Sequence, residues 1–223
     1  MTQTVLILGA NGKIGSHAAA AFWNAGWTVR KYQRGTDMNA AAMGADVIVN
    51  GLNPPNYADW ARNIPAITTQ VIAAAQASGA TVIVPGNIYN FGDQGGTYDE
   101  NTPQRAHTRK GKIRITMEQT YRDANVRTII LRAGNFLDPN GNGDLMGFMA
   151  KDIAKGKLMG FGDPDAMQAY AYVPDWARAA VMLADRRADL PRFADIPFPG
   201  HAFRLTDLQA ELLEELLKKG QDI

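Results

Sequence analysis

Three glycines near the N-terminus have the spacing of a backbone cradle for a phosphate group. Gly9, Gly12 and Gly15 form a G-x-x-G-x-x-G pattern. In such a pattern the first glycine allows a tight turn, the second lets the backbone approach a pyrophosphate, and the third lets a helix pack closely on a strand. The amide groups at the N-terminus of the following helix would face the phosphates. The pattern therefore predicts a dinucleotide-binding site.

The segment from Val29 to Arg34 determines which dinucleotide we expect. It reads Val-Arg-Lys-Tyr-Gln-Arg, and the next acidic residue is Asp37. Sites that prefer NAD usually carry Asp or Glu near the end of this strand, where the carboxylate binds the adenosine ribose. Arg34 would instead form a bidentate pair with a 2′-phosphate. The sequence therefore favours NADP(H) over NAD(H), with Arg34 in the cofactor site.

Short apolar runs alternate with helical stretches in the first part of the chain. The expected strands are residues 5–8, 28–33, 46–50, 81–84 and 128–131, and the expected helices are residues 13–25, 57–78 and 110–124. Continuous apolar strands separated by helices indicate a parallel sheet that is covered on both faces. This predicts an α/β fold with a doubly wound parallel sheet of the Rossmann type. The glycines then lie between the first strand and the first helix, as phosphate binding requires.

The composition excludes several other kinds of protein. The 223 residues include 23 Lys and Arg, 22 Asp and Glu, and no Cys. Disulfide scaffolds and Cys nucleophiles are thereby excluded, and a net charge of +1 disfavours nucleic acid as a partner. The chain has no apolar run long enough for a membrane span and no signal-like N-terminus. The three histidines lack ligand-like spacing, so we expect no metal site. We expect a cytoplasmic protein with a small-molecule substrate.

Beyond these patterns, the sequence resembles the extended or atypical short-chain dehydrogenase/reductase superfamily, and within it the NAD-dependent epimerase/dehydratase-like branch. Residues 9–15 match its N-terminal glycine motif, and residues 131–136 and 172–177 resemble its "LRPGNFYG" and "YVDDVA" segments. The resemblance extends from Val5 to about Asp207. It implies that the cofactor also contacts Asn11, Lys13 and Ile14, and that the loop with Leu52 and Asn53 lies at the nicotinamide end. A simple turn is an equal alternative for Asn53.

The catalytic Ser, Tyr and Lys of this superfamily are all replaced. Its "SSxxVYG" segment falls on residues 86–92 and places Asn87 at the serine. Its "YGxSKxxxE" segment falls on residues 110–118 and places Lys110 at the tyrosine and Arg114 at the lysine, while an alternative register uses Lys112. In these places Asn87 could donate a hydrogen bond to a carbonyl oxygen, and Arg114 could hold the nicotinamide ribose. Lys110 could act as a proton donor, and His107 is another candidate acid.

Two functions are compatible with this set. The first is an NADP(H)-binding oxidoreductase or epimerase/dehydratase-like enzyme that acts on a small carbonyl or hydroxyl compound. The second is a non-catalytic NADP(H)-binding sensor or regulatory protein, similar to the nitrogen-metabolite-repressor-like members that lack the tyrosine. The sequence leaves the substrate, the reaction direction and the oligomeric state open, and a homodimer is compatible with it.

The chain is shorter than extended members of the superfamily. Only residues 35–45 separate the second and third strands, where a typical member has a further strand and helix with an acidic residue near the adenine. We therefore expect a short helix over Met38–Met43 and an open adenine pocket. We expect one domain, residues 1–223, with a small substrate lobe from about 136–172 and 191–223. Its last helix carries a leucine stripe, and we expect it to begin at a Thr206–Gln209 capping box and to pack on the core.

Overall fold

The computed structural model describes residues 2–54, 58–140, 145–160 and 162–218. Its main sheet has six parallel strands in the order β2-β1-β3-β4-β5-β8. The strands are β1 (Thr4–Leu8), β2 (Thr28–Lys31), β3 (Val47–Asn50), β4 (Thr81–Gly86), β5 (Thr128–Arg132) and β8 (Phe193–Pro197). The strand order changes direction between β1 and β3. This confirms the doubly wound α/β fold, with its switch point beside the glycine pattern.

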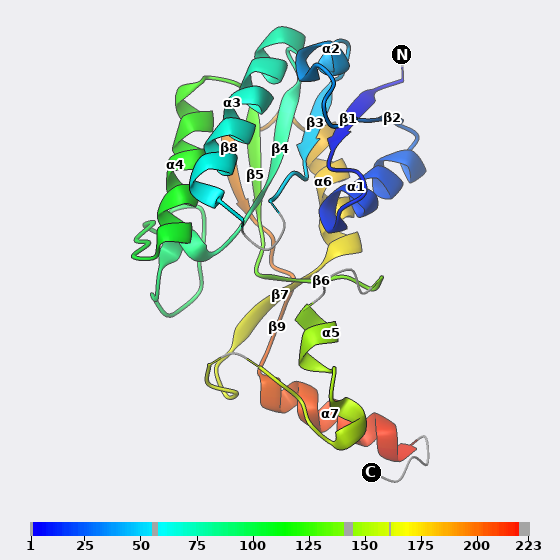
Figure 1. Cartoon of the computed structure of the whole chain (residues 1–223), viewed down its shortest axis with the longest axis vertical. Coiled ribbons are helices and arrows are strands. Elements are labelled where there is room, and N and C mark those ends of the chain that lie inside the picture. The colour runs from blue at the N-terminus through cyan, green and yellow to red at the C-terminus, as the bar shows by residue number, and fades with distance from the viewer. Residues whose placement is uncertain (1, 55–57, 141–144, 161, 219–223) are drawn as a thin grey trace.

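Helices cover both faces of this sheet (Figure 1). One face carries α1 (Lys13–Asn24) and α6 (Val173–Asp185), and the other carries α3 (Trp60–Ser78) and α4 (Arg109–Asp123). Since successive strand residues point to opposite faces, β1 contributes Leu6 and Leu8 to one core, and Val5 and Ile7 to the other. The helix expected from Tyr57 begins at Trp60, and Tyr57 lies outside the described residues.

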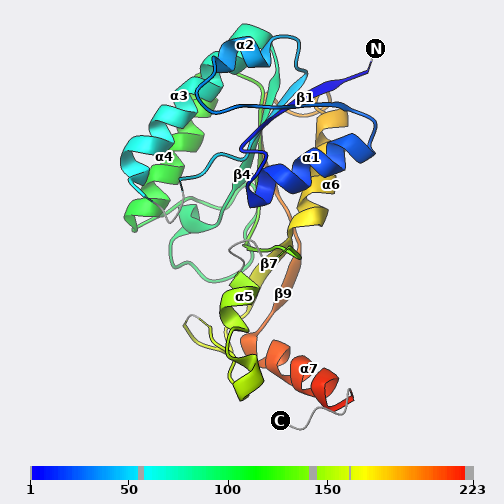
Figure 2. The same ribbon diagram turned by 45° about the vertical axis from the view of Figure 1, so that its right-hand side comes forward.

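The main sheet ends at β2, because no strand in the described part of the chain pairs with its outer edge. The chain passes instead into the short helix α2 (Met38–Ala42), whose N-cap Asp37 accepts a hydrogen bond from the backbone of Asn39. The expected short helix over Met38–Met43 is thus confirmed. The helix α2 lies at the end of the sheet opposite the lobe, where it packs against α3 (Figures 1 and 2).

A smaller lobe extends from the carboxyl ends of the main strands (Figures 1 and 2). Its sheet has the order β6-β7-β9, with β6 (Asn135–Leu137), β7 (Gln168–Tyr172) and β9 (His201–Phe203). The lobe also contains α5 (Leu145–Met149), the 3₁₀ turn η3 (Ile153–Lys155) and α7 (Leu205–Lys218). The pattern of the sequence did not indicate β6, because this three-residue strand depends on pairing with β7.

Three expectations for the C-terminal part need correction. Residues 193–197 form β8 of the main sheet and do not belong to the lobe. The helix α7 lies at the far end of the lobe, away from the main sheet (Figure 2). Thr206 lies inside α7, where its hydroxyl donates to Asp165, and the capping contact is instead made by Asp207, which accepts from the backbone of Arg204. Among the described helices, none has the length and apolar character needed to cross a bilayer.

Candidate functional site

The glycines after β1 interlock with the loop after β3. Gly9 has a φ of +72°, and a Cβ at this position would lie 2.9 Å from the carbonyl oxygen of Gly51. A Cβ on Gly15 would lie 2.2 Å from the carbonyl oxygen of Gly9. Both distances are too short for a side chain, so the close approach of α1 to the two strands requires glycine at these places.

Gly12 differs from its two neighbours in the pattern. A Cβ on Gly12 would meet only the carbonyl oxygen of Gly9, at 3.3 Å. Gly12 is exposed and is the N-cap of α1, and as a glycine it has no side chain that could cap the helix. The first-turn amides of a helix have no partner within the helix, and they favour a negative charge. The surface at Gly12 is therefore shaped and polarised for a phosphate.

The three other residues expected at the cofactor lie around the same turn. Asn11 is exposed, whereas Lys13 and Ile14 are half-buried in the first turn of α1. Ile14 packs against the core between α1 and α6. Lys13 lies near enough to Asp138, beyond β6, to contribute to lowering the pKa of that carboxyl.

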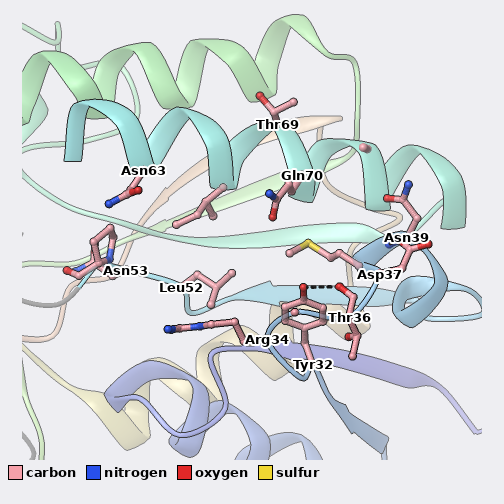
Figure 3. Close-up of a pocket in the computed structure, with 15 residues that line it drawn as sticks. Tyr32, Arg34, Thr36, Asp37, Asn39, Leu52, Asn53, Asn63, Thr69 and Gln70 are labelled. Atoms are coloured by element: carbon pink, nitrogen blue, oxygen red, sulfur yellow. Dashed lines mark hydrogen bonds between the residues drawn. The ribbon is translucent and has the colours of Figure 1, made fainter. Parts of the chain in front are cut away.

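A cavity of about 770 Å³ opens between the end of β2 and the helices α2 and α3. Arg34, Leu52 and Asn53, which the sequence assigns to the cofactor from two separate loops, all line this cavity (Figure 3). Leu52 and Asn53, which we expected at the nicotinamide end, thus lie in the same cavity as Arg34, which we expected at the adenosine end. Leu52 also adjoins the glycine cradle, because its backbone nitrogen would lie 3.3 Å from a Cβ on Gly9. The cradle and the cavity therefore form one continuous site along the switch point.

A buried hydrogen-bonded pair supports the loop after β3. The Asn50 side chain accepts from the backbone of Leu52 at 3.2 Å and donates to the Tyr121 hydroxyl of α4 at 3.2 Å. Burial raises the pKa of Tyr121, although the bond from Asn50 and the charge of Arg114 oppose this. The Tyr121 hydroxyl therefore stays protonated, and its role is to hold Asn50.

Asn87 follows β4 at the carboxyl edge of the sheet. Its side-chain oxygen accepts from the backbone of Tyr89 at 3.0 Å, and its backbone carbonyl accepts from Arg132 at 2.6 Å. Its Nδ2 group makes no hydrogen bond to any residue that the structure describes. Asn87 thus presents a donor, as a group that polarises a carbonyl must.

Lys110 and Arg114 lie in the first turns of α4. The two are four residues apart and so share a face of the helix, whereas Lys112 lies about 200° around it from Lys110. Lys110 is exposed. The Arg114 guanidinium lies 5.0 Å from the Trp60 ring centre and donates to the Met117 sulfur at 3.4 Å. Lys110 and Arg114 therefore share one face of α4, and Lys112 lies on another.

A buried ionic network that the sequence pattern did not single out fixes this end of the site. Arg132 of β5 forms bonds of 2.7 Å to Glu118 of α4 and 2.6 Å to Asp195 of β8. Burial alone would lower the pKa of Arg132, but the two carboxylates raise it. Gln104 also donates to Glu118, at 3.0 Å. Glu118 and Arg132 both lie in segments that resemble the superfamily. This resemblance was the one feature of the sequence that could have drawn attention to them.

A second contact that the sequence did not indicate joins α1 to the lobe. His17 Nε2 lies 2.9 Å from the Asp138 carboxylate, which also accepts from the backbone of Asn140 at 2.9 Å. Burial raises the pKa of Asp138. The hydrogen bonds from His17 and Asn140, together with the charges of His17 and Lys13, lower the pKa by more than burial raises it, so it lies below its usual value. No group of three or more potential metal ligands gathers in the described residues.

Comparison with known proteins establishes the fold. No protein-family model and no curated protein matches the chain. UDP-glucuronic acid 4-epimerase from Bacillus cereus in complex with NAD is 18% identical, with a TM-score of 0.82 over 97% of this chain and 84% of that one. MoeE5 in complex with UDP-glucose and NAD is 17% identical, with a TM-score of 0.78 over 95% of this chain and 82% of that one.

The Bordetella bronchiseptica enzyme WbmH in complex with NAD⁺ is 15% identical, with a TM-score of 0.77 over 97% of this chain and 82% of that one. The chain therefore has the NAD-binding Rossmann fold that is found in sugar epimerases. The resemblance to the extended short-chain dehydrogenase/reductase superfamily is confirmed at the level of the fold.

The predicted preference for NADP(H) is wrong. The three solved structures named above are complexes with NAD, which favours NAD(H). The cavity offers a physical reason: the Arg30 guanidinium donates to the carbonyl of Met43 at 2.8 Å, and Arg30 is not among the described residues that line the cavity. Asp37 lines it together with Arg34. The charged side chains described along the cavity are thus one cation, Arg34, and one anion, Asp37.

Proposed function

We propose that the chain binds NAD(H) along the carboxyl ends of β1 and β3, with the pyrophosphate at Gly12 and the adenosine in the 770 Å³ cavity. The observation that carries this proposal is the interlocked backbone of Gly9, Gly15 and Gly51, which leaves Gly12 open at an uncapped helix N-terminus. In the cavity, the Arg34 guanidinium would stack on the adenine. The Asp37 carboxylate would accept from the ribose hydroxyls, as acidic residues do in NAD sites.

We further propose that the chain is an epimerase-like oxidoreductase acting on a hydroxyl or carbonyl group. NAD(H), when bound, supplies the acceptor or donor of the hydride. Asn87 Nδ2 donates a hydrogen bond to the substrate oxygen. Lys110 Nζ holds or accepts the hydroxyl proton, and Arg114 holds the nicotinamide ribose one turn further along α4.

The substrate would lie between the start of α4 and the lobe. A small cavity of about 100 Å³ in the lobe is lined by the polar side chains of Asn135, Gln168 and Tyr170. Nucleotide sugars are the first class to test, because MoeE5 has been solved with UDP-glucose in the same fold. Asn135 and Tyr170 are already joined through Gln168, at 3.4 Å from each.

The test begins with NADH binding, measured by fluorescence, and continues with turnover of UDP-glucose and UDP-glucuronic acid. Lys110→Ala should lower kcat by about 10²- to 10⁴-fold and leave the Kd for NADH unchanged. Lys112→Ala is the matched control on the other side of α4 and should leave both quantities unchanged. Equal losses in the two variants would contradict the role of Lys110.

A second function, an NAD(H)-binding regulatory protein without turnover, is favoured by one observation. The position aligned with the superfamily's tyrosine carries an exposed lysine, Lys110. NADH binding without turnover of either nucleotide sugar or of a panel of simple carbonyl compounds would support this function. Turnover that depends on Lys110 would exclude it.

A further inference from the structure

The end of the cavity that lies away from the glycine cradle (Gly9, Gly12 and Gly15) is lined by helices. β2 is the outermost strand of the main sheet, and the chain crosses from it directly to α2. The wall there consists of side chains from α2 and α3 (Figure 3). Any group that recognises the base at this end must therefore belong to one of these helices or to the loop after β2.

One face of α3 lines the cavity. Asn63, Ile67, Gln70 and Ala73 follow one another at spacings of four, three and three residues, so they lie along one side of the helix, and all four line the cavity. Ile67 and Leu52 supply apolar surface against which a planar ring can pack. Gln70 points from α3 into the space above Leu52 and Tyr32 (Figure 3).

Most polar side chains of this wall already have partners. Asn63 donates to the carbonyl of Ala58 at 3.0 Å, Thr69 donates to that of Pro65 at 3.1 Å, and Tyr32 donates to that of Thr36 at 2.8 Å. The carboxamide of Gln70, in contrast, makes no hydrogen bond to any residue that the structure describes. Among the polar side chains of α3 that line the cavity, the Gln70 carboxamide is thus the one that remains available to a ligand.

A glutamine carboxamide places one acceptor beside two donors. The edge of an adenine ring carries the 6-amino donor next to a ring-nitrogen acceptor, and glutamine pairs with this edge in a bidentate manner. We propose that Gln70 reads the 6-amino edge of the adenine and makes the site specific for this base. The inference rests on the proposed binding of NAD(H), and it assigns base recognition to α3.

The test compares NADH with the reduced nicotinamide purine dinucleotide, in which hydrogen replaces the 6-amino group. The Kd of each is measured by fluorescence titration. The wild-type chain should bind NADH about tenfold more tightly than the purine analogue. In Gln70→Leu, which keeps the size of the side chain, this preference should fall below about twofold because NADH binding weakens.

Thr69→Val is the matched control, since the Thr69 hydroxyl is already bonded to Pro65, and it should keep the tenfold preference. Equal melting temperatures of the three proteins would show that the fold is intact. A Gln70→Leu variant that keeps the wild-type preference would overturn the assignment of Gln70, as would a wild-type chain that binds both dinucleotides equally. A wild-type chain that binds neither would instead overturn the proposed function.

Discussion

The two ends of the site are built in different ways. At the cradle, the backbone makes the contacts, and a Cβ on Gly15 would lie 2.2 Å from the carbonyl oxygen of Gly9. At the end near β4 and α4, side chains make the contacts, through the bonds of Arg132 to Glu118 and Asp195. Backbone packing admits one residue type, whereas side-chain positions allow exchange. This contrast agrees with a sequence in which the glycine pattern matches that of the superfamily, whereas Asn87, Lys110 and Arg114 are only predicted to stand at its Ser, Tyr and Lys.

The largest effect is expected for Arg132→Met. This substitution leaves the carboxylates of Glu118 and Asp195 without their buried cation, and breaking such a network costs about 3–5 kcal/mol of unfolding free energy. Urea denaturation measures this loss. Because the network lies away from the cradle, NADH affinity should remain within about threefold of wild type at temperatures where the variant is folded.

Lys155→Met is the control for this prediction. Lys155 pairs with Asp152 at 2.9 Å on the surface, and an exposed pair contributes less than about 1 kcal/mol. If Arg132→Met loses NADH binding while still folded, the two ends of the site are coupled, and the contrast between them is wrong.

Gly15→Ala, unlike Arg132→Met, should weaken NADH binding as well as stability. The methyl group would collide with the backbone of Gly9, so we expect a loss of about 1–3 kcal/mol in unfolding free energy together with weakened NADH binding. Gly95→Ala should be neutral within about 0.5 kcal/mol, because a Cβ there meets nothing within 4 Å. Thermal melting and NADH titration of both variants check this. A Gly15→Ala protein as stable as Gly95→Ala would show that the cradle is not closely packed.

The smallest effect is expected for the contact between α1 and the lobe, which joins His17 to Asp138. The pKa of Asp138 is lowered in the folded state, so its stabilising contribution is present above its unfolded pKa of about 4 and is lost as the pH falls through the folded value. Asp138→Asn should therefore flatten the decline of unfolding free energy below about pH 4. Asp93→Asn, at an exposed carboxylate, should keep the wild-type slope. If unfolding free energy declines with the same slope below about pH 4 in the wild type, Asp138→Asn and Asp93→Asn, the Asp138 contact has no stabilising role.

The sequence predicted the elements whose residues are set by local rules. Continuous apolar strands and the glycine spacing indicated the main sheet and the cradle, and the short segment 35–45 indicated that the sheet ends at β2. Arg34, Leu52 and Asn53, which we assigned to the cofactor, line one cavity. The roles of Asn87, Lys110 and Arg114 remain predictions.

Contacts between distant residues were not predictable. The hydrogen bond of Arg30 to the carbonyl of Met43 could not be known from the strand itself. The pairing of Arg132 with Asp195, and of His17 with Asp138, joins residues 63 and 121 positions apart. The strand β6 and the placement of α7 also depend on the lobe as a whole, which has no local pattern of its own.

NADH titration of Gly12→Ala tests the central claim most directly. Gly12 has an extended backbone that alanine can adopt, and an added methyl group would occupy part of the exposed surface where we propose that the pyrophosphate lies. If the cradle binds NAD(H), the affinity should fall about tenfold or more, and the melting temperature should stay within about 3 °C of wild type. Wild-type NADH affinity in a folded Gly12→Ala protein would contradict the account.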